Sequence, residues 1–284
     1  MEKLLMNRLS INAALMFVLS ARALTASAAT SEALAQSPPM GWNSFDSYGV
    51  YLHEQAALAN LEAMAEKLLP YGYEYFVIDN GWFGEYTLQE GTIFPAEKHA
   101  HDIRIDEYGY FLPSEVYFPN GLKPIAERCH ELGLKFGVHL MRGIPRKAYE
   151  MDLPIKGTRY TARDIANTSP EENCKWCHYC YAVDMSKPGA QQWYDGLIEH
   201  IASMGVDMIK YDDIVAHPDE VEAVAKAIAR TGRPILLSLS PGGKVDPEAI
   251  DFFKMGNMLR VTPDVWDEQK YIDLCFDAWR KWEG

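Results

Sequence analysis

Short apolar segments alternate with longer amphipathic ones along the chain from residue 38 onward. Apolar residues at helical spacing predict helices at residues 54–69, 121–132, 187–204, 219–230, 246–254 and 267–282. Short apolar runs predict strands at residues 39–44, 73–79, 134–140, 206–210, 234–239 and 257–260. Strands that alternate with helices are typical of a parallel α/β fold.

This alternation leaves two architectures open. A closed (β/α)8 TIM-type barrel needs eight strand–helix pairs, and the pattern supplies about six. An open doubly wound sheet can be built from fewer pairs. Both architectures place polar residues at the C-terminal ends of their strands, as this sequence does. The long polar stretches 83–119 and 141–187 are interpreted as loop excursions.

The N-terminus has the features of a targeting signal. Lys3 and Arg8 form a basic start, residues 11–19 are apolar, and residues 26–28 read Ala-Ser-Ala, a typical cleavage site. We therefore predict a signal peptide at residues 1–28, a catalytic unit at residues 29–284 and a secreted or periplasmic protein. A natural N-terminal helix is the alternative. No other segment is apolar enough to span a bilayer, so we predict no membrane partner.

The charge of the chain excludes one class of partner. The formal net charge is −13, and the sequence shows no basic face. Nucleic acids are bound through clustered Lys and Arg, so we predict no nucleic-acid partner. The sequence does not decide the oligomeric state.

Three of the five cysteines are spaced C-x-x-C-x-x-C, at Cys174, Cys177 and Cys180, with His178 among them. Structural zinc sites need four ligands, commonly as two separated pairs, and the second pair is absent from the sequence. A disulfide or a free-thiol loop is therefore favoured over a metal site. We predict neither a metal nor a cofactor.

Two carboxylates follow predicted strands and are candidates for catalysis. In Lys210-Tyr211-Asp212, strand alternation directs Lys210 and Asp212 to one face, where the cation would keep the carboxylate ionised as a nucleophile. A structural ion pair is the alternative. A Schiff-base role for Lys210 is disfavoured, because an adjacent carboxylate raises the pKa of an amine.

Asp264 follows the last predicted strand and is the candidate general acid. Such a group must hold a proton, which Pro263 and Trp266 could promote by covering it. An N-cap for the helix predicted from residue 267 is the alternative. Two carboxylates on one rim suit cleavage of a glycosidic bond by double displacement.

Other strand ends carry groups suited to sugar hydroxyls. Asp79 and Asn80 follow the second predicted strand, and His139 lies near the end of the third. Each taken singly is equally well explained by a turn or by a satisfied polar residue. Their shared position at one rim supports a site.

The motifs at these positions resemble glycoside hydrolase family 27, the melibiase group. The matching stretches are 38–44 (PPMGWNS), 72–82 (GYEYFVIDNGW), 135–139 (KFGVH), 210–212 (KYD), and Arg260 with Asp264. The resemblance implies that Asp212 is the nucleophile and Asp264 the acid/base, and that residues 79, 210 and 260 bind sugar hydroxyls. It also implies a (β/α)8 barrel followed by a β-sandwich, of which the last two barrel units and the sandwich are missing here.

Departures from the family pattern bear on the sugar. Galactose-cutting members usually have Asp, Trp and Tyr where this chain has Asn80, Phe45 and His139, and they read the 2-hydroxyl with a Glu near Ser240. Trp42 and Phe45 complete the predicted substrate-binding set. We predict a retaining α-galactosidase-like hydrolase acting on a glycoside or oligosaccharide. The alternatives are an α-N-acetylgalactosaminide, a β-L-arabinopyranoside or an isomaltose unit as substrate, or a non-catalytic carbohydrate-binding remnant.

Overall fold

The computed structural model describes residues 34–86, 102–215, 217–241 and 245–283. The predicted signal peptide, residues 1–28, lies outside these ranges. Within them, no helix is both long enough and apolar enough to cross a membrane.

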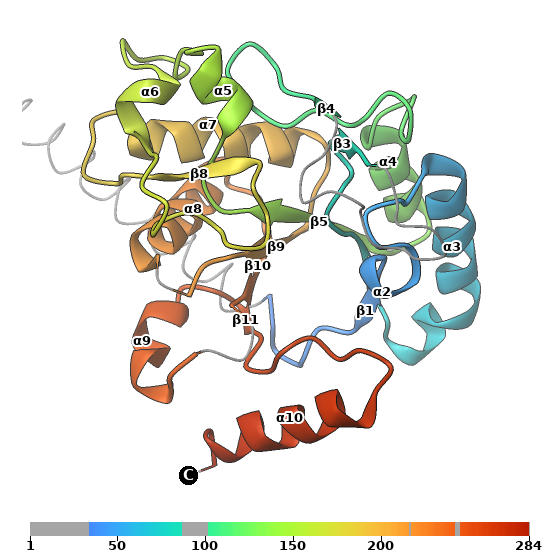
Figure 1. Cartoon of the computed structure of the whole chain (residues 1–284). Helices are drawn as coiled ribbons and strands as arrows, with labels where there is room; N and C mark the ends of the chain where they lie inside the picture. Colours follow the sequence, from blue (N-terminus) through green and yellow to red (C-terminus); the bar gives the residue numbers. More distant parts are fainter. Residues whose placement is uncertain (1–33, 87–101, 216, 242–244, 284) are drawn as a thin grey trace, which may run out of the picture.

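A curled, parallel six-stranded sheet forms the centre of the fold (Figure 1). Its order is β1-β2-β5-β9-β10-β11, which follows the chain. The strands are β1 (Gly41–Asn43), β2 (Tyr75–Ile78), β5 (Lys135–Met141), β9 (Met208–Asp212), β10 (Leu236–Ser240) and β11 (Met258–Leu259). The predicted α/β fold with about six β/α units is confirmed.

At least one helix follows each strand of this sheet in the chain, as the alternation predicts. These helices are α3 (Glu54–Lys67), α4 (Lys123–Glu131), α7 (Ala190–Ser203), α8 (Pro218–Thr231), α9 (Ile250–Phe253) and α10 (Gln269–Arg280). The short helix α2 (Phe45–Tyr48) and the 3-10 turn η1 (Leu69–Tyr71) flank α3. The helix predicted at 246–254 is divided, because Asp246 caps a separate 3-10 turn, η2 (Pro247–Ala249), before α9.

Local sequence signals explain where the long helices begin and end. In α3, the His53 side chain accepts a hydrogen bond from the Ala56 amide and caps the N-terminus. Helix α8 starts with Pro218 in its first turn and ends at Gly232, whose left-handed φ of 68° suits a C-terminal glycine.

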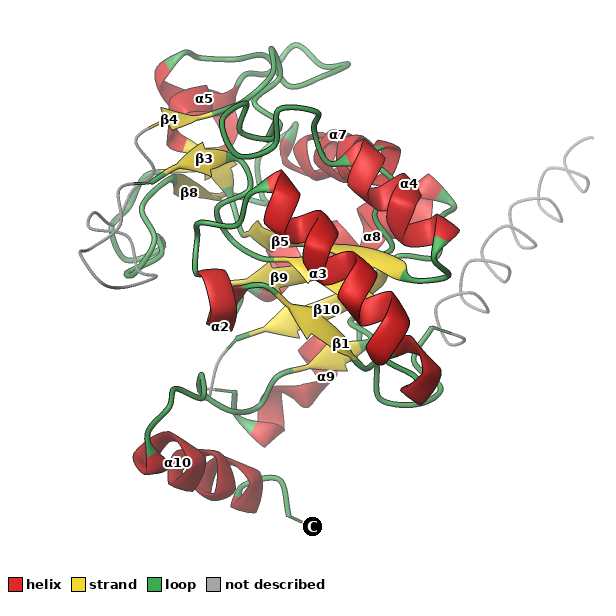
Figure 2. Ribbon diagram, turned by 90° about the vertical axis from the view of Figure 1, so that its right-hand side faces the viewer, coloured by secondary structure: helices red, strands yellow, loops and turns green. Residues whose placement is uncertain are grey.

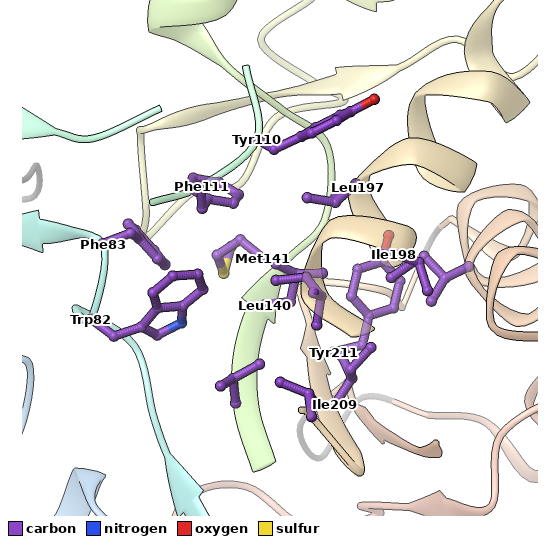
Figure 3. Packing of buried hydrophobic residues seen from close by; sticks show 14 of the residues in the cluster. Trp82, Phe83, Tyr110, Phe111, Leu140, Met141, Leu197, Ile198, Ile209 and Tyr211 are labelled. Carbon is purple, nitrogen blue, oxygen red and sulfur yellow. The ribbon is translucent and has the colours of Figure 1, made fainter. Parts of the chain in front are cut away.

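Side-chain alternation along the strands divides the core into two parts. One set of side chains packs outward against the helices, around the buried residues shown in Figure 3, such as Trp82, Phe111, Leu140 and Ile209. A second, smaller cluster consists of Tyr75, Val77, Met208 and Leu236. Strand alternation places this cluster on the inner face of the curled sheet. Polar groups continue this inner face toward the C-terminal ends of the strands.

The two predicted excursions contain secondary structure of their own. Stretch 83–119 holds the antiparallel pair β3 (Gly84–Glu85) and β4 (Asp102–Ile103), with residues 87–101 outside the described ranges. Stretch 141–187 forms the strands β6 (Ile144–Pro145), β7 (Ala166–Asn167) and β8 (Cys180–Val183) and the helices α5 (Arg146–Glu150) and α6 (Ala162–Ile165). Pairs this short carry too little periodicity to be predicted from sequence.

The sheet ends at β1 on one side and at β11 on the other among the described residues. Helix α10 stands apart from the other helices at the end of the chain (Figures 1 and 2). Its large apolar side chains are exposed: Ile272, Leu274, Phe276 and Trp279. This flank of the molecule is much less packed than the one formed by β2, β5 and β9.

Candidate active site

Asp79 is buried directly after β2, at the C-terminal end of the sheet. Its Oδ2 atom accepts hydrogen bonds from Asn43 Nδ2 and from Lys210 Nζ, both at 2.6 Å. The Ser44 hydroxyl accepts a hydrogen bond of 2.9 Å from the Asp79 amide. Burial raises the pKa of Asp79, but the charges of Lys210 and His139 outweigh it and lower the pKa to about 2. Asp79 is therefore a fixed, ionised acceptor.

Lys210 forms its ion pair with Asp79 rather than with Asp212, which corrects the pairing expected from sequence. The strand register explains the difference. His139 lies opposite Lys210 in the β5–β9 pair, so the imidazole reaches the Asp212 carboxylate. Lys210 still lowers the pKa of Asp212 through its charge.

Asp212 ends β9 and is held at both carboxylate oxygens. The Asp213 amide donates to Oδ1 at 2.8 Å, and His139 Nε2 lies 3.4 Å from Oδ2. Burial raises the pKa of Asp212, but the contact with His139 and the charges of His139 and Lys210 lower it overall. The side chain is 15% exposed, so it is enclosed, ionised and still reachable by a small ligand.

Three buried polar atoms of predicted site residues have no hydrogen-bond partner among the described residues. They are His139 Nδ1, Ser240 Oγ and Arg260 Nε. Ser240 pairs with Asp212 in the β9–β10 register, so its hydroxyl lies at the same level of the sheet. Most buried polar groups in proteins are satisfied, and a cluster of unsatisfied ones suits the hydroxyls of a sugar.

Asp264 lies in the loop after β11 and forms an ion pair with Arg260. Its side chain is 59% exposed, so it is not buried to the extent that was expected from cover by Pro263 and Trp266. The expected alternative, an N-cap, is also wrong, because Glu268 occupies that position at α10. Asp264 thus belongs to the less packed flank of the molecule.

The two predicted aromatic residues differ in position. The Phe45 ring lies 5.9 Å from Lys210 Nζ and 6.3 Å from the Trp266 ring, so it forms an apolar wall at the site. The Trp42 ring stacks on Phe76 at a centroid distance of 5.0 Å, in the layer between the sheet and the helices. Strand alternation directs Asn43, and not Trp42, toward Asp79. The Trp42 ring therefore packs against the core, while Trp42 is also among the residues that line the neighbouring cavity.

Asn80 is nearly buried, and its Oδ1 atom accepts a hydrogen bond of 3.0 Å from the Tyr179 hydroxyl. Tyr179 comes from the cysteine-containing excursion and was not predicted as a site residue. Asp46 was also missed. Burial raises the pKa of Asp46, and the negative charges of Asp264 and Asp79 raise it further, whereas the charge of Lys210 lowers it. Asp46 therefore lies close to these three charged residues.

The cysteines of this excursion, Cys174, Cys177 and Cys180, are buried as free thiols. Burial raises the pKa of Cys174 to about 12. In the part of the chain that the structure describes, no three or more His, Cys, Asp or Glu side chains form a group that could hold a metal.

A cavity of about 410 Å³, a volume suited to a small-molecule ligand, is lined by Lys210 and Ser240, whereas Asp79, His139 and Asp212 are not among its lining residues. The lining also includes Asn43, Arg260, three residues of the inner cluster (Tyr75, Val77 and Met208) and Trp279 of α10.

Comparison with known proteins agrees with this geometry. Residues 40–270 match the family model described as the glycosyl hydrolases family 31 TIM-barrel domain. The chain belongs to the TIM-barrel glycosyl hydrolases. The partial sheet is thus a section of a TIM-type barrel, as predicted.

Solved structures relate the chain more narrowly to family 27. A family 27 β-L-arabinopyranosidase of Geobacillus stearothermophilus is 42% identical with a TM-score of 0.80, over 88% of this chain and 58% of that one. A proposed α-N-acetylgalactosaminidase of Bacillus halodurans is 37% identical with a TM-score of 0.72, over 87% and 58%. The resemblance to family 27 read from the motifs is confirmed.

Curated relatives include an α-galactosidase of Cyamopsis tetragonoloba, 26% identical over 239 residues, which cover 82% of this chain and 45% of the relative. Another is α-galactosidase A of Cellvibrio japonicus, 29% identical over 85% of this chain and 47% of the relative. The chain spans about half the length of the curated relatives it matches.

In this glycosyl hydrolase chain the sequence-predicted residues fall into three groups. Asp79, His139, Lys210 and Asp212 form one contacting cluster. Ser240, Arg260, Asp264 and Phe45 lie around it. Trp42 packs on the outer layer and Asn80 is tied to Tyr179. An enclosed ionised carboxylate beside unsatisfied polar atoms can attack an electrophilic carbon of a bound sugar.

Proposed function

We propose that this chain carries the catalytic site of a retaining glycoside hydrolase. Asp212 attacks the anomeric carbon, and Asp264 gives a proton to the leaving glycosidic oxygen, which leaves a covalent glycosyl–enzyme. Asp264 then takes a proton from water, and the water oxygen displaces Asp212 from the anomeric carbon. The sugar is released with its original anomeric configuration.

The observation that carries this proposal is the state of Asp212. Its pKa is lowered although it is largely buried, because His139 and Lys210 compensate for the loss of solvent. A carboxylate kept ionised in an enclosed site is what a covalent nucleophile requires. Asp79 is ionised in the same cluster and is suited to accept hydrogen bonds from sugar hydroxyls.

For the sugar, we propose a terminal α-D-galactoside or the equivalent β-L-arabinopyranoside. The two rings have the same configuration at every shared carbon, and only galactose carries a hydroxymethyl group at C5. The 42% identity with a β-L-arabinopyranosidase favours the arabinopyranoside. An N-acetylgalactosaminide is the next candidate, because Ser240 is small and its hydroxyl is unsatisfied.

A panel of nitrophenyl glycosides tests this proposal. We expect turnover of the β-L-arabinopyranoside and of the α-galactoside, with the former faster, and little turnover of the α-glucoside. NMR of the first-formed sugar should show a retained anomer. An inverted anomer would rule out the double displacement. A folded protein that binds the sugars without turnover would instead favour a carbohydrate-binding remnant.

We further propose that the protein acts outside the cytoplasm on oligosaccharides, because residues 1–28 have the pattern of a signal peptide. Mass spectrometry of the mature N-terminus should find cleavage after Ala28. An intact N-terminus on the cell-associated protein would contradict export by this route.

A further inference from the structure

Asp213, the residue after the proposed nucleophile, has a backbone conformation that is rare for its type. Its φ is +61°, in the left-handed region that glycine adopts most easily. Such a conformation persists only where the surroundings hold it. The amide of Asp213 donates to Asp212 Oδ1 at 2.8 Å, so the orientation of this peptide fixes one oxygen of the nucleophile.

Arg142, directly after β5, holds Asp213 in place. Its Nε atom donates to the Asp213 carbonyl and its Nη2 atom to the Asp213 carboxylate, each at 2.7 Å. The backbone amide of Arg142 donates to the Asp212 carbonyl at 3.2 Å. Arg142 thus donates hydrogen bonds to the carbonyl groups of both Asp212 and Asp213.

Arg142 is itself fixed from two further elements. It is 3% exposed, and its Nη1 atom donates to Glu220 Oε1 of α8 at 2.9 Å. Its Nη2 atom also donates to the Glu172 carbonyl at 2.8 Å. Glu220 is buried and accepts a short hydrogen bond from the Tyr194 hydroxyl of α7. The guanidinium therefore cannot turn without breaking several buried contacts.

We propose that Arg142 is a positioning residue for Asp212, acting through Asp213 and not through contact with the sugar. It keeps the Asp213 peptide turned so that its amide holds Oδ1, while His139 holds Oδ2. This inference rests on the proposed hydrolase function. A planar fork of donors is needed, because the single ammonium of a lysine cannot reach the carbonyl, the carboxylate and Glu220 together.

The test compares kcat and KM of Arg142→Lys with the wild type on the preferred nitrophenyl glycoside, using the full chain. We expect kcat to fall about 100-fold, since a misplaced reacting group costs roughly that factor, with KM changed by less than about threefold. Arg146→Lys is the matched control. Arg146 is the first residue of α5, where its guanidinium lies over the Tyr181 ring and its Nε atom donates to the Cys180 carbonyl, so kcat of this variant should stay within about twofold of the wild type.

A second pair of variants tests the clamp without altering Arg142. Asp213→Gly and Asp213→Ala both keep the amide donor and lose the carboxylate. Glycine adopts a positive φ readily, whereas alanine does not. We expect the alanine variant to have about tenfold lower kcat than the glycine variant.

Equal kcat values for the glycine and alanine variants would overturn the clamp, as would a folded Arg142→Lys enzyme with wild-type kcat. Absence of turnover in the folded wild type would instead overturn the proposed function itself.

Discussion

The candidate catalytic carboxylates on the two flanks of the sheet differ in their burial and in their partners. On the β2–β5–β9 flank, Asp79 is 2% and Asp212 is 15% exposed, and both carboxylates accept hydrogen bonds from neighbouring residues. On the β11 flank, Asp264 is 59% exposed and forms an ion pair with Arg260, four residues earlier. The difference suggests that the packed sheet prepares the proposed nucleophile, whereas the proposed acid lies exposed in the loop after β11.

The largest expected effect comes from the packed flank. Asp212→Asn removes the proposed nucleophilic carboxylate while keeping the size of the side chain and most of its hydrogen bonds. We expect kcat on the preferred aryl glycoside to fall by at least about 1,000-fold, as for loss of other covalent nucleophiles. Asp219→Asn, an exposed carboxylate in the first turn of α8, is the control and should leave kcat unchanged. A comparable fall of kcat in both variants would show that Asp212 is not the nucleophile.

Lys210→Met tests whether the packed flank depends on its ion pair. The change leaves the buried Asp79 carboxylate without its cation, and removing one partner of a buried pair costs roughly 3–5 kcal/mol of unfolding free energy. The pair Lys135–Glu74 has the same 2.6 Å separation but is about half exposed, so Lys135→Met should cost less than about 1 kcal/mol. Chemical denaturation measures both. Equal losses would show that the burial of Asp79 does not matter.

Asp264→Asn tests the open flank. Because the side chain is exposed, we expect a change in unfolding free energy within about 0.5 kcal/mol. Activity should still fall about 100-fold on glycosides with poor leaving groups, the usual contribution of a general acid, and less on nitrophenyl glycosides. Azide should restore turnover by attacking the glycosyl–enzyme. An enzyme equally active on all leaving groups would mean that another residue is the acid.

Acid pH should destabilise the packed flank through protonation of Asp79. The pKa of Asp79 falls to about 2 in the folded protein from an ordinary value of 3.8, so the stability it contributes is present above about pH 4. That contribution, about 2 kcal/mol, is lost as the pH falls from about 4 to about 2. Denaturation curves over this range should show the loss in the wild type and much less of it in Asp79→Asn. Parallel curves would contradict the lowered pKa.

The sequence predicted most of the packed flank and less of the contacts within it. Strand alternation was enough to place Asp79, Lys210 and Asp212 at one end of one sheet. It could not predict that Lys210 forms its ion pair with Asp79, because this pairing depends on the strand register that places His139 beside Asp212.

Other features needed the three-dimensional structure. Trp42 suits a core and a sugar site equally well by composition, and only its stacking on Phe76 decides its role. The contact of Tyr179 with Asn80 and that of Arg142 with Asp213 join residues 99 and 71 positions apart. No local pattern reports such contacts. The only sequence signal for Asp213 was its place next to Asp212.

Trapping of the covalent intermediate tests the central claim most directly. The wild type would be incubated with an activated 2-deoxy-2-fluoro glycoside of the preferred sugar, digested, and mapped by mass spectrometry. A single sugar on the peptide containing Asp212, absent from Asp212→Asn, is the predicted result. A label on Asp264 or on another residue, or turnover of substrate to an inverted sugar, would contradict the assignment of Asp212 as the nucleophile.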